Sequence, residues 1–414
     1  MTQARFARDH RPMPATGPLN LITDVAGLLV GNAEDERART GVTVILPEGR
    51  AVGAVDVRGG APGTRESDAL QPSGLVHEID ALVLSGGSVY GLDAASSVTA
   101  WLGARGRGFS LSGAETVAPI VPAAILFDLT NGGDKAWGEA PPYATLGRRA
   151  VEAATREFRL GNFGAGRGAR AGALKGGLGS ASAATADGVT VGALAAVNSF
   201  GSVLIPGTRT FWAWPFERDR EFGGQTPPAG PMPDLALPAD TKLGTAARAH
   251  TTLGVVACDA VLTRLEAERI AVMAQDGLAR AIRPVHTPFD GDVVYALATG
   301  WRALPEARAL SVMAIGALAA DCLARATRAA STKRRQPTAS RLIAAEFRLV
   351  ARGPGGNLAE ACPRRRISRL LRQGPGDKSV CGRNRLNSAG GVPISNVMPE
   401  CAWTETSNPP LPRN

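Results

Sequence analysis

The first half of the chain alternates short apolar segments with glycine-rich turns. Several of these segments are continuous apolar runs rich in β-branched residues, which is typical of strands buried on both faces. Two longer segments, at residues 91–102 and 146–158, are predicted to be helices. The pattern predicts strands at residues 41–46, 51–57, 81–85, 119–129 and 189–197.

The pattern becomes regular again after residue 250, where Thr251 and Thr252 lead into an apolar, strand-like run. Thr263 and Glu266 match a capping box, which marks the start of a helix. A strand is predicted at 292–299 and a last helix at about 306–328. The apolar faces of the two helices are formed by Ile270, Met273, Ala274, Gly277, Leu278 and Ala281, and by Ile315, Leu318, Ala319, Cys322 and Ala326. Sheet and helices in this mixture predict a layered α/β body, residues 19–330.

The segment 207–250 differs from the rest, because it is rich in proline and glycine and shows no period. Loops of this length within a domain are uncommon and are often functional or flexible. Its aromatic residues could line a pocket or could simply pack the loop against the core. These residues are Phe211, Trp212, Trp214 and Phe216.

Composition indicates a soluble globular protein, with 44% hydrophobic residues and a mean hydropathy of −0.02. No run approaches the roughly 18 apolar residues of a membrane span, and residues 1–18 form a leader without the apolar core of a secretory signal. We therefore expect a cytoplasmic protein that does not bind membranes. The five cysteines are far apart and odd in number, which supports neither a zinc site nor a disulfide framework.

The net charge of +9 comes from the end of the chain. Residues 331–414 hold 15 Lys/Arg and 5 Asp/Glu, a net of +10, which leaves −1 for residues 1–330. The body therefore gives no reason to expect nucleic acid as a partner. The basic tail is predicted to be disordered, with binding to nucleic acid or an acidic partner as the alternative.

Several common chemistries are excluded by the sequence. It contains neither a phosphate-binding G-x-x-x-x-G-K-[ST] loop nor a G-x-S-x-G nucleophile elbow. The histidines His10, His77, His250 and His286 lack metal-ligand spacing. We therefore predict neither a metal nor a cofactor.

The junction between His250 and Thr251 is the strongest candidate for chemistry. A loop rich in Pro and Gly leads to His250, and an apolar strand follows. If the chain cuts itself there, the freed threonine carries both a nucleophilic hydroxyl and its own base, the new α-amine. The alternative is an ordinary strand threonine, a common occurrence.

Other polar residues sit at the ends of apolar or glycine-rich segments. The backbone N–H groups of Gly86, Gly87 and Ser88 follow a strand and open a helix, where they could stabilise an oxyanion or only form a turn. Lys175 is a single lysine in a glycine-rich segment, where a partly buried amine could lower the pKa of a neighbouring amine. Asn198 ends an apolar strand, where its amide could donate to an oxyanion or cap a turn.

Asp290 and Asp292 place two carboxylates near a strand start, where they could pair with a substrate amine or form a turn.

Together these segments resemble the DmpA-type peptidases, the L-aminopeptidase/D-esterase family that includes β-peptidyl aminopeptidases and the nylon-oligomer hydrolase. The resemblance covers about residues 19–329. It rests on six blocks in the same order, at residues 20–25, 57–65, 84–93, 175–182, 251–256 and 286–292.

The resemblance implies a four-layer αββα sandwich that cleaves itself between His250 and Thr251. The products would be an α chain of residues 1–250 and a β chain from Thr251, assembled into homo-oligomers that act on small peptides or amides. Thr251 takes the nucleophile position, and Lys175 and Asn198 lie beside it. Tyr90 matches an active-site tyrosine, and Asp290 and Asp292 match polar residues that support the nucleophile.

The chain departs from the family pattern at two positions. His250 stands where the family usually has Gly or Asn, so strain at this bulkier residue predicts slow or incomplete processing. Thr251 replaces the serine of the aminopeptidases, which favours the nylon-oligomer hydrolase branch. Two alternatives remain: an acyltransferase resembling the ornithine acetyltransferases, and an uncleaved binding or scaffold protein.

Overall fold

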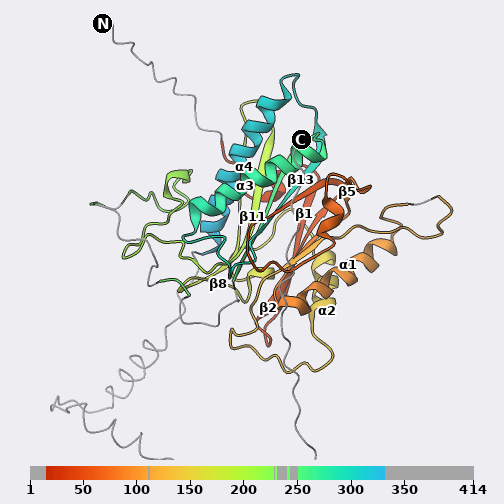
Figure 1. Ribbon diagram of the computed structural model, residues 1–414, viewed down its shortest axis with the longest axis horizontal. Helices are drawn as coiled ribbons and strands as arrows, with labels where there is room; N and C mark the ends of the chain where they lie inside the picture. Colours follow the sequence, from red (N-terminus) through yellow and green to blue (C-terminus); the bar gives the residue numbers. More distant parts are fainter. Residues whose placement is uncertain (1–14, 111, 228, 231–239, 243–249, 332–414) are drawn as a thin grey trace, which may run out of the picture. The chain divides into compact units, whose positions relative to one another are not determined.

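A computed structural model describes residues 15–331, except 111, 228, 231–239 and 243–249 (Figure 1). All described residues belong to one compact unit, Met1–Arg341. A second unit, Leu342–Asn414, lies outside the described residues, as does nearly all of the predicted leader and basic tail.

The first sheet contains five strands in the order β1-β2-β6-β7-β4. Only the β6–β7 pair is parallel, and the other pairs are antiparallel. Helices α1 (Ala94–Gly103) and α2 (Tyr143–Glu152) pack together and against this sheet. Its strands are β1 (Leu28–Asp35), β2 (Thr40–Pro47), β4 (Thr64–Arg65), β6 (Leu82–Ser85) and β7 (Ala123–Ile125).

The second sheet contains six strands in the order β10-β11-β12-β13-β3-β5. Its β12–β13 pair is parallel, and β12 and β13 lie between β11 and β3. Helices α3 (Arg264–Ala281) and α4 (Arg308–Ala330) cover this sheet. Its strands are β3 (Ala51–Val57), β5 (Glu78–Ile79), β10 (Gly177–Ala184), β11 (Thr190–Asn198), β12 (Thr251–Ala260) and β13 (Val293–Arg302).

The two sheets pack face to face through a central apolar core. Leu28 and Leu84 of the first sheet belong to the same buried cluster as Leu194, Leu253 and Tyr295 of the second. Two further apolar clusters join each sheet to its own pair of helices. In Figure 1 the pair α3 and α4 lies on one side of the strands and the pair α1 and α2 on the other. The described residues therefore form the expected four-layer αββα sandwich.

Burial on both faces explains why the strands lack an alternating pattern. Every residue of β2 and of β12 is buried, because each strand has a sheet on one face and helices on the other. The predictions for 51–57 and 189–197 agree with β3 and β11 within a residue. The predicted strand 119–129 is wrong in length, since only Ala123–Ile125 pairs in the sheet.

The helix predictions are correct in kind and shifted in their bounds. The segment after β6 first forms a 3-10 helix, η3 (Ser88–Asp93), and α1 begins only at Ala94. Helix α2 begins at Tyr143 and ends at Glu152, earlier than the predicted 146–158. Helices α3 and α4 and strand β13 agree closely with their predictions.

The described part of the 207–250 segment contains a short 3-10 helix, η5 (Trp214–Phe216), and an isolated bridge between Leu204 and Phe211. Phe211 is buried in the core beneath α4, where Arg328 lies over its ring. Phe211 and the partly buried Phe216 therefore pack this segment against the core. Phe216 also lines a surface groove of about 420 Å³ beside α4.

Helix α4 is long and apolar enough to span a membrane by length and composition, although no apolar run of that length was expected. Its apolar stretch is 67% buried within the protein. It packs on β10 and β11, as the core helix of a layered domain does.

Candidate active site

The loop-to-strand boundary lies at the peptide bond between His250 and Thr251. Thr251 is the first residue of β12, and in the register of the sheet it faces Asn198, the last residue of β11. His250 lies just outside the strand and forms an isolated bridge with Asp290. Both residues of the junction are buried, with 3% and 4% of their surfaces exposed.

Two donors converge on the carbonyl oxygen of His250. The Thr251 hydroxyl donates to it at 2.5 Å, and the backbone N–H of Gly291 donates to it at 2.9 Å. The hydroxyl therefore lies against the carbonyl group that it would attack. A backbone N–H on that oxygen is the arrangement that stabilises charge as it develops there.

His250 is accommodated by its surroundings. Its ring packs on Phe200, with 5.2 Å between the ring centroids. Its backbone is not among the positive-φ residues of the described chain, so the expected strain is absent at that dihedral. Slow or incomplete processing at His250 stays a prediction.

Asp292 fixes the start of β12. One carboxylate oxygen accepts the Thr252 N–H at 2.7 Å, and the other accepts the His286 N–H at 3.1 Å and lies 2.9 Å from His286 Nδ1. The strand that carries Thr251 is thereby tied to the loop before β13. Asp292 therefore holds Thr251 indirectly, through the backbone of Thr252.

Asp290 also holds the loop before β13, through bonds within the loop and to Phe200. It accepts the Phe200 N–H at 3.2 Å, and both the N–H and the hydroxyl of Thr287 at 2.9 and 2.6 Å. Burial and the nearby Asp292 carboxylate raise its pKa. Both aspartates are thus engaged within the protein, and the loop they shape places the Gly291 N–H on the His250 carbonyl oxygen.

The Asn198 side chain lies between three segments. Its Oδ1 accepts the Arg170 N–H at 2.9 Å and a Lys242 Nζ proton at 3.1 Å. Its Nδ2 donates to the Phe127 carbonyl at 2.9 Å. The predicted place beside Thr251 is therefore observed, and its amide orientation is set by these partners.

Lys175 belongs to a hairpin close to the end of β11. Strand β9 (Leu174–Lys175) pairs with β8 (Arg170–Ala171), and β8 contacts β11. Lys175 Nζ donates to the carbonyls of Gly166, Arg167 and Ala169 at 3.2, 3.1 and 2.8 Å. Burial, with help from the Arg167 charge, lowers its pKa to about 8.

The three backbone N–H groups expected to hold an oxyanion already have acceptors. Gly86 donates to the Gly41 carbonyl at 2.9 Å, and Ser88 donates to that of Leu126 at 3.0 Å. Gly87 donates to the buried carboxylate of Asp128 at 2.8 Å. An oxyanion role for these groups would require all three bonds to be exchanged, so Gly291 is the better-placed donor.

Tyr90 lies in η3 and is half-exposed. Its ring meets that of Trp137 edge to face at 5.8 Å, and Trp137 meets Tyr143 in the same way. Among the described residues, no hydrogen bond joins Tyr90 to Thr251. The structure therefore shows Tyr90 in an aromatic cluster with Trp137 and Tyr143, and its role in the active site stays a prediction.

Lys242 is a site residue that the sequence patterns do not indicate. It lies in the Pro- and Gly-rich segment, yet only 6% of its surface is exposed. Its Nζ donates to the backbone carbonyl of Asn198 at 2.9 Å, in addition to Oδ1. The sequence offers one signal for it. Before residue 331 the only lysines are Lys135, Lys175 and Lys242, and the other strongly basic residues are arginines.

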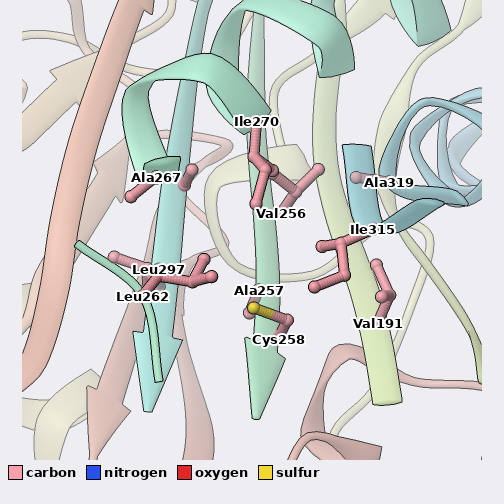
Figure 2. A pocket seen from close by; sticks show the side chains of 11 residues that line it. Val191, Val256, Ala257, Cys258, Leu262, Ala267, Ile270, Leu297, Ile315 and Ala319 are labelled. Atoms are coloured by element: carbon pink, nitrogen blue, oxygen red, sulfur yellow. The ribbon is translucent and has the colours of Figure 1, made fainter. Parts of the chain in front are cut away.

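A closed cavity of about 10 Å³ lies between β12 and the helices α3 and α4 (Figure 2). Eleven residues with apolar side chains line it, among them Val256, Ile270 and Ile315. Val256 is five residues beyond Thr251, or about 17 Å along a strand. The cavity is therefore a packing defect of the core, separate from the Thr251 site.

The described cysteines are unsuited to nucleophilic chemistry. Cys258 and Cys322 are buried free thiols, and burial raises their pKa to about 12 and 11. Within the described part of the chain, no three His, Cys, Asp or Glu side chains are grouped to hold a metal ion. Thr251 is therefore the nucleophile candidate with the strongest geometry.

Comparison with known proteins identifies the family. The model of peptidase family S58 matches residues 20–346. The chain belongs to peptidase family S58. An uncharacterized aminopeptidase of Mycobacterium tuberculosis is 48% identical over 325 residues, which cover 74% of this chain and 92% of that protein. A 6-aminohexanoate-oligomer endohydrolase of a Kocuria species is 29% identical, covering 77% and 87%.

Solved structures show the same fold. A β-aminopeptidase of a Burkholderia species superposes with a TM-score of 0.57 at 22% identity, covering 83% of this chain and 97% of that one. An L-aminopeptidase D-Ala-esterase/amidase of Ochrobactrum anthropi, described as a variant of the Ntn-hydrolase fold, gives a TM-score of 0.54 at 20% identity, covering 77% and 87%. This member of family S58 is accordingly an amide- or peptide-bond hydrolase with an Ntn-hydrolase-type α/β sandwich.

Proposed function

We propose that this S58 peptidase cleaves itself between His250 and Thr251 and then hydrolyses amide bonds with Thr251 as an N-terminal nucleophile. The observation that carries the proposal is the pair of donors on the His250 carbonyl oxygen, the Thr251 hydroxyl and the Gly291 N–H. Attacking group and oxyanion donor are thus assembled on one buried peptide bond.

The cleavage is an N→O acyl shift followed by hydrolysis. Thr251 Oγ1 attacks the His250 carbonyl carbon, and the Gly291 N–H stabilises the negative oxygen of the tetrahedral intermediate. The C–N bond then breaks, the proton of the hydroxyl passes to the departing nitrogen, and an ester joins His250 to Oγ1. Water hydrolyses this ester, leaving a carboxylate on His250 and a free amine and hydroxyl on Thr251.

The mature reaction uses the same hydroxyl on a substrate amide. The new α-amine, with an ordinary pKa of about 8, accepts the hydroxyl proton, and the substrate acyl group forms an ester on Oγ1. Water releases the acyl group. Asn198 of β11 faces Thr251 in the sheet, and Lys175 lies in the hairpin that contacts β11. Their polar groups support the neutral α-amine of Thr251 and the charged tetrahedral intermediate.

The proposed substrates are small peptides or linear amides. The names of the relatives, aminopeptidase and 6-aminohexanoate-oligomer endohydrolase, support these two classes. The half-exposed Tyr90 and the turn at Gly86–Ser88 are proposed to contact the substrate. Assembly of processed αβ pairs into homo-oligomers in the cytoplasm completes the proposal, and light scattering of the purified protein tests the assembly.

Replacement of the nucleophile tests the proposal directly. Wild-type protein of 42.7 kDa should appear on a denaturing gel as chains of about 26 and 17 kDa, in proportion to their residues. Thr251→Ala should remain one full-length chain without amidase activity, whereas Thr251→Ser, which keeps the hydroxyl, should retain both reactions. A cleaved and active Thr251→Ala protein would disprove the proposal.

A further inference from the structure

Lys242 joins the segment before the cleavage site to the strand beside the nucleophile. Its side chain reaches the end of β11, where Nζ donates to Asn198 O at 2.9 Å and to Asn198 Oδ1 at 3.1 Å. Its own backbone N–H donates to the Phe200 carbonyl at 3.1 Å. Phe200 in turn packs on His250, so Lys242 is fixed to the end of β11 and to the residue that contacts the junction.

The Asn198 amide needs partners that distinguish its two ends. Oxygen and nitrogen of an amide have nearly the same size, and the hydrogen-bond partners decide which way the group points. Lys242 Nζ and the Arg170 N–H both require an acceptor, so Oδ1 turns toward them. Nδ2 then faces the Phe127 carbonyl. Lys242 thus supplies, beside the Arg170 N–H, a donor that sets this orientation.

We propose that Lys242 is a positioning residue of the Thr251 site, which acts by holding Asn198 in the orientation that both self-cleavage and amide hydrolysis require. The inference rests on the proposed function and extends it to a residue of the segment before the cut. Lys242 lies eight residues before His250. After cleavage it anchors the new C-terminal segment of the α chain to the end of β11.

The electrostatic surroundings are consistent with this structural use of a lysine. Burial lowers its pKa, the charges of Arg170 and Lys175 act in the same direction, and Asp290 acts in the opposite one. A neutral amine keeps two N–H groups. It can therefore still donate both bonds to Asn198, and it places no charge in the interior.

Kinetics of Lys242→Met test the inference, with Lys135→Met as the matched control. Methionine keeps the length and volume of the stem and loses the donors. Lys135 is a partly buried lysine that donates to the Ala38 carbonyl and to Asn131, and within the described residues it has no hydrogen bond to Asn198 or to the His250–Thr251 junction. We expect Lys242→Met to lower kcat and the self-cleavage rate by about 10- to 100-fold, with KM changed less than about twofold. Lys135→Met should leave both rates unchanged.

A double-mutant cycle separates positioning from a general structural role. If Lys242 acts through Asn198, Lys242→Met should have little further effect in an Asn198→Ala background. Effects that add in the double variant would overturn the inference, as would wild-type rates in Lys242→Met. If Lys242→Met is insoluble, Lys242→Gln, which retains a shorter donor, takes its place in the same cycle. Wild-type protein that stays uncut and inactive would instead refute the proposed function.

Discussion

At the scale of single residues, the site depends on backbone groups as much as on side chains. Gly291 contributes only its N–H, yet it lies where a side chain does not fit. A Cβ at this position would be 2.7 Å from both Thr251 Oγ1 and the Ala61 carbonyl oxygen. Thr251, Gly291 and Ala61 therefore lie in direct contact.

Gly291→Ala should block self-cleavage while leaving the fold intact. The added methyl group must displace Thr251 Oγ1 or the loop, and a shift of about 1 Å can lower a rate about 100-fold. The band pattern on denaturing gels over time measures the effect. Gly49→Ala is the control, because a Cβ there meets nothing within 4 Å. Equal processing rates in the two variants would refute the assignment of Gly291.

Asp292→Asn should slow processing and destabilise the precursor. One of the two carboxylate oxygens becomes an N–H donor facing the donor of Thr252 or of His286, and an unmet buried group costs about 1–3 kcal/mol. Urea unfolding and the cleavage half-time measure the two effects. Asp187→Asn, on an exposed turn, should change neither, and matching behaviour of the two variants would contradict the role of Asp292.

The sequence identifies residues whose role follows from chain order, but not those whose role depends on long-range contacts. Thr251 and Asn198 mark ends of apolar strands, so their position in the sheet could be predicted. Lys242 meets Asn198 across 44 residues, and only the fold brings them together. The turn at 86–88 was predicted in its place, but its N–H groups bond to segments that the pattern does not pair with it.

At the scale of elements, small residues allow α4 to approach β10 closely. A Cβ on Gly179 would lie 2.0 Å from the Ala326 carbonyl oxygen and 2.5 Å from the Ala330 nitrogen. This explains why β10, with the sequence GLGSASAA, resembles a flexible turn in the sequence although it is a buried strand. Its composition reflects the helix above it rather than strand propensity.

Gly179→Ala should lower the free energy of unfolding by about 1–3 kcal/mol, because α4 must move away from the sheet. Urea unfolding of the uncut Thr251→Ala protein measures it, since a single chain gives a simpler transition. Gly103→Ala in α1 is the control with the opposite sign. Its Cβ would have contacts no closer than 3.7 Å, so we expect a gain of about 0.5–1 kcal/mol. A stability gain in both variants would contradict the close packing of α4.

At the scale of the whole molecule, buried lysines make stability depend on pH. Lys175 has a pKa of about 8 in the folded protein, and an ordinary lysine has one of about 10.4. Between these values the unfolded chain binds more protons than the folded one, so the free energy of unfolding rises with pH. Lys242, whose pKa is also lowered by burial, acts in the same direction.

Lys175→Met should therefore flatten the rise of stability between about pH 8 and 10.4. Urea midpoints of the uncut Thr251→Ala protein across this range measure the slope without interference from a new α-amine. Arg148→Met, which removes an exposed cation from α2, should leave the slope as it is. Lys242 should leave part of the slope in place, so a slope as steep as that of the Thr251→Ala protein would mean that Lys175 stays protonated in the fold.

The order of the second sheet has a consequence for what happens after the cut. Strands β12 and β13 would belong to the β chain, and their neighbours β11 and β3 to the α chain. The uncut protein closes this sheet within one molecule, whereas the processed protein, once denatured, must find its partner by diffusion. Recovery of native protein should then depend on concentration for the processed enzyme and not for Thr251→Ala. Self-cleavage would thus exchange a unimolecular folding reaction for a bimolecular one whose yield depends on the concentration of both chains.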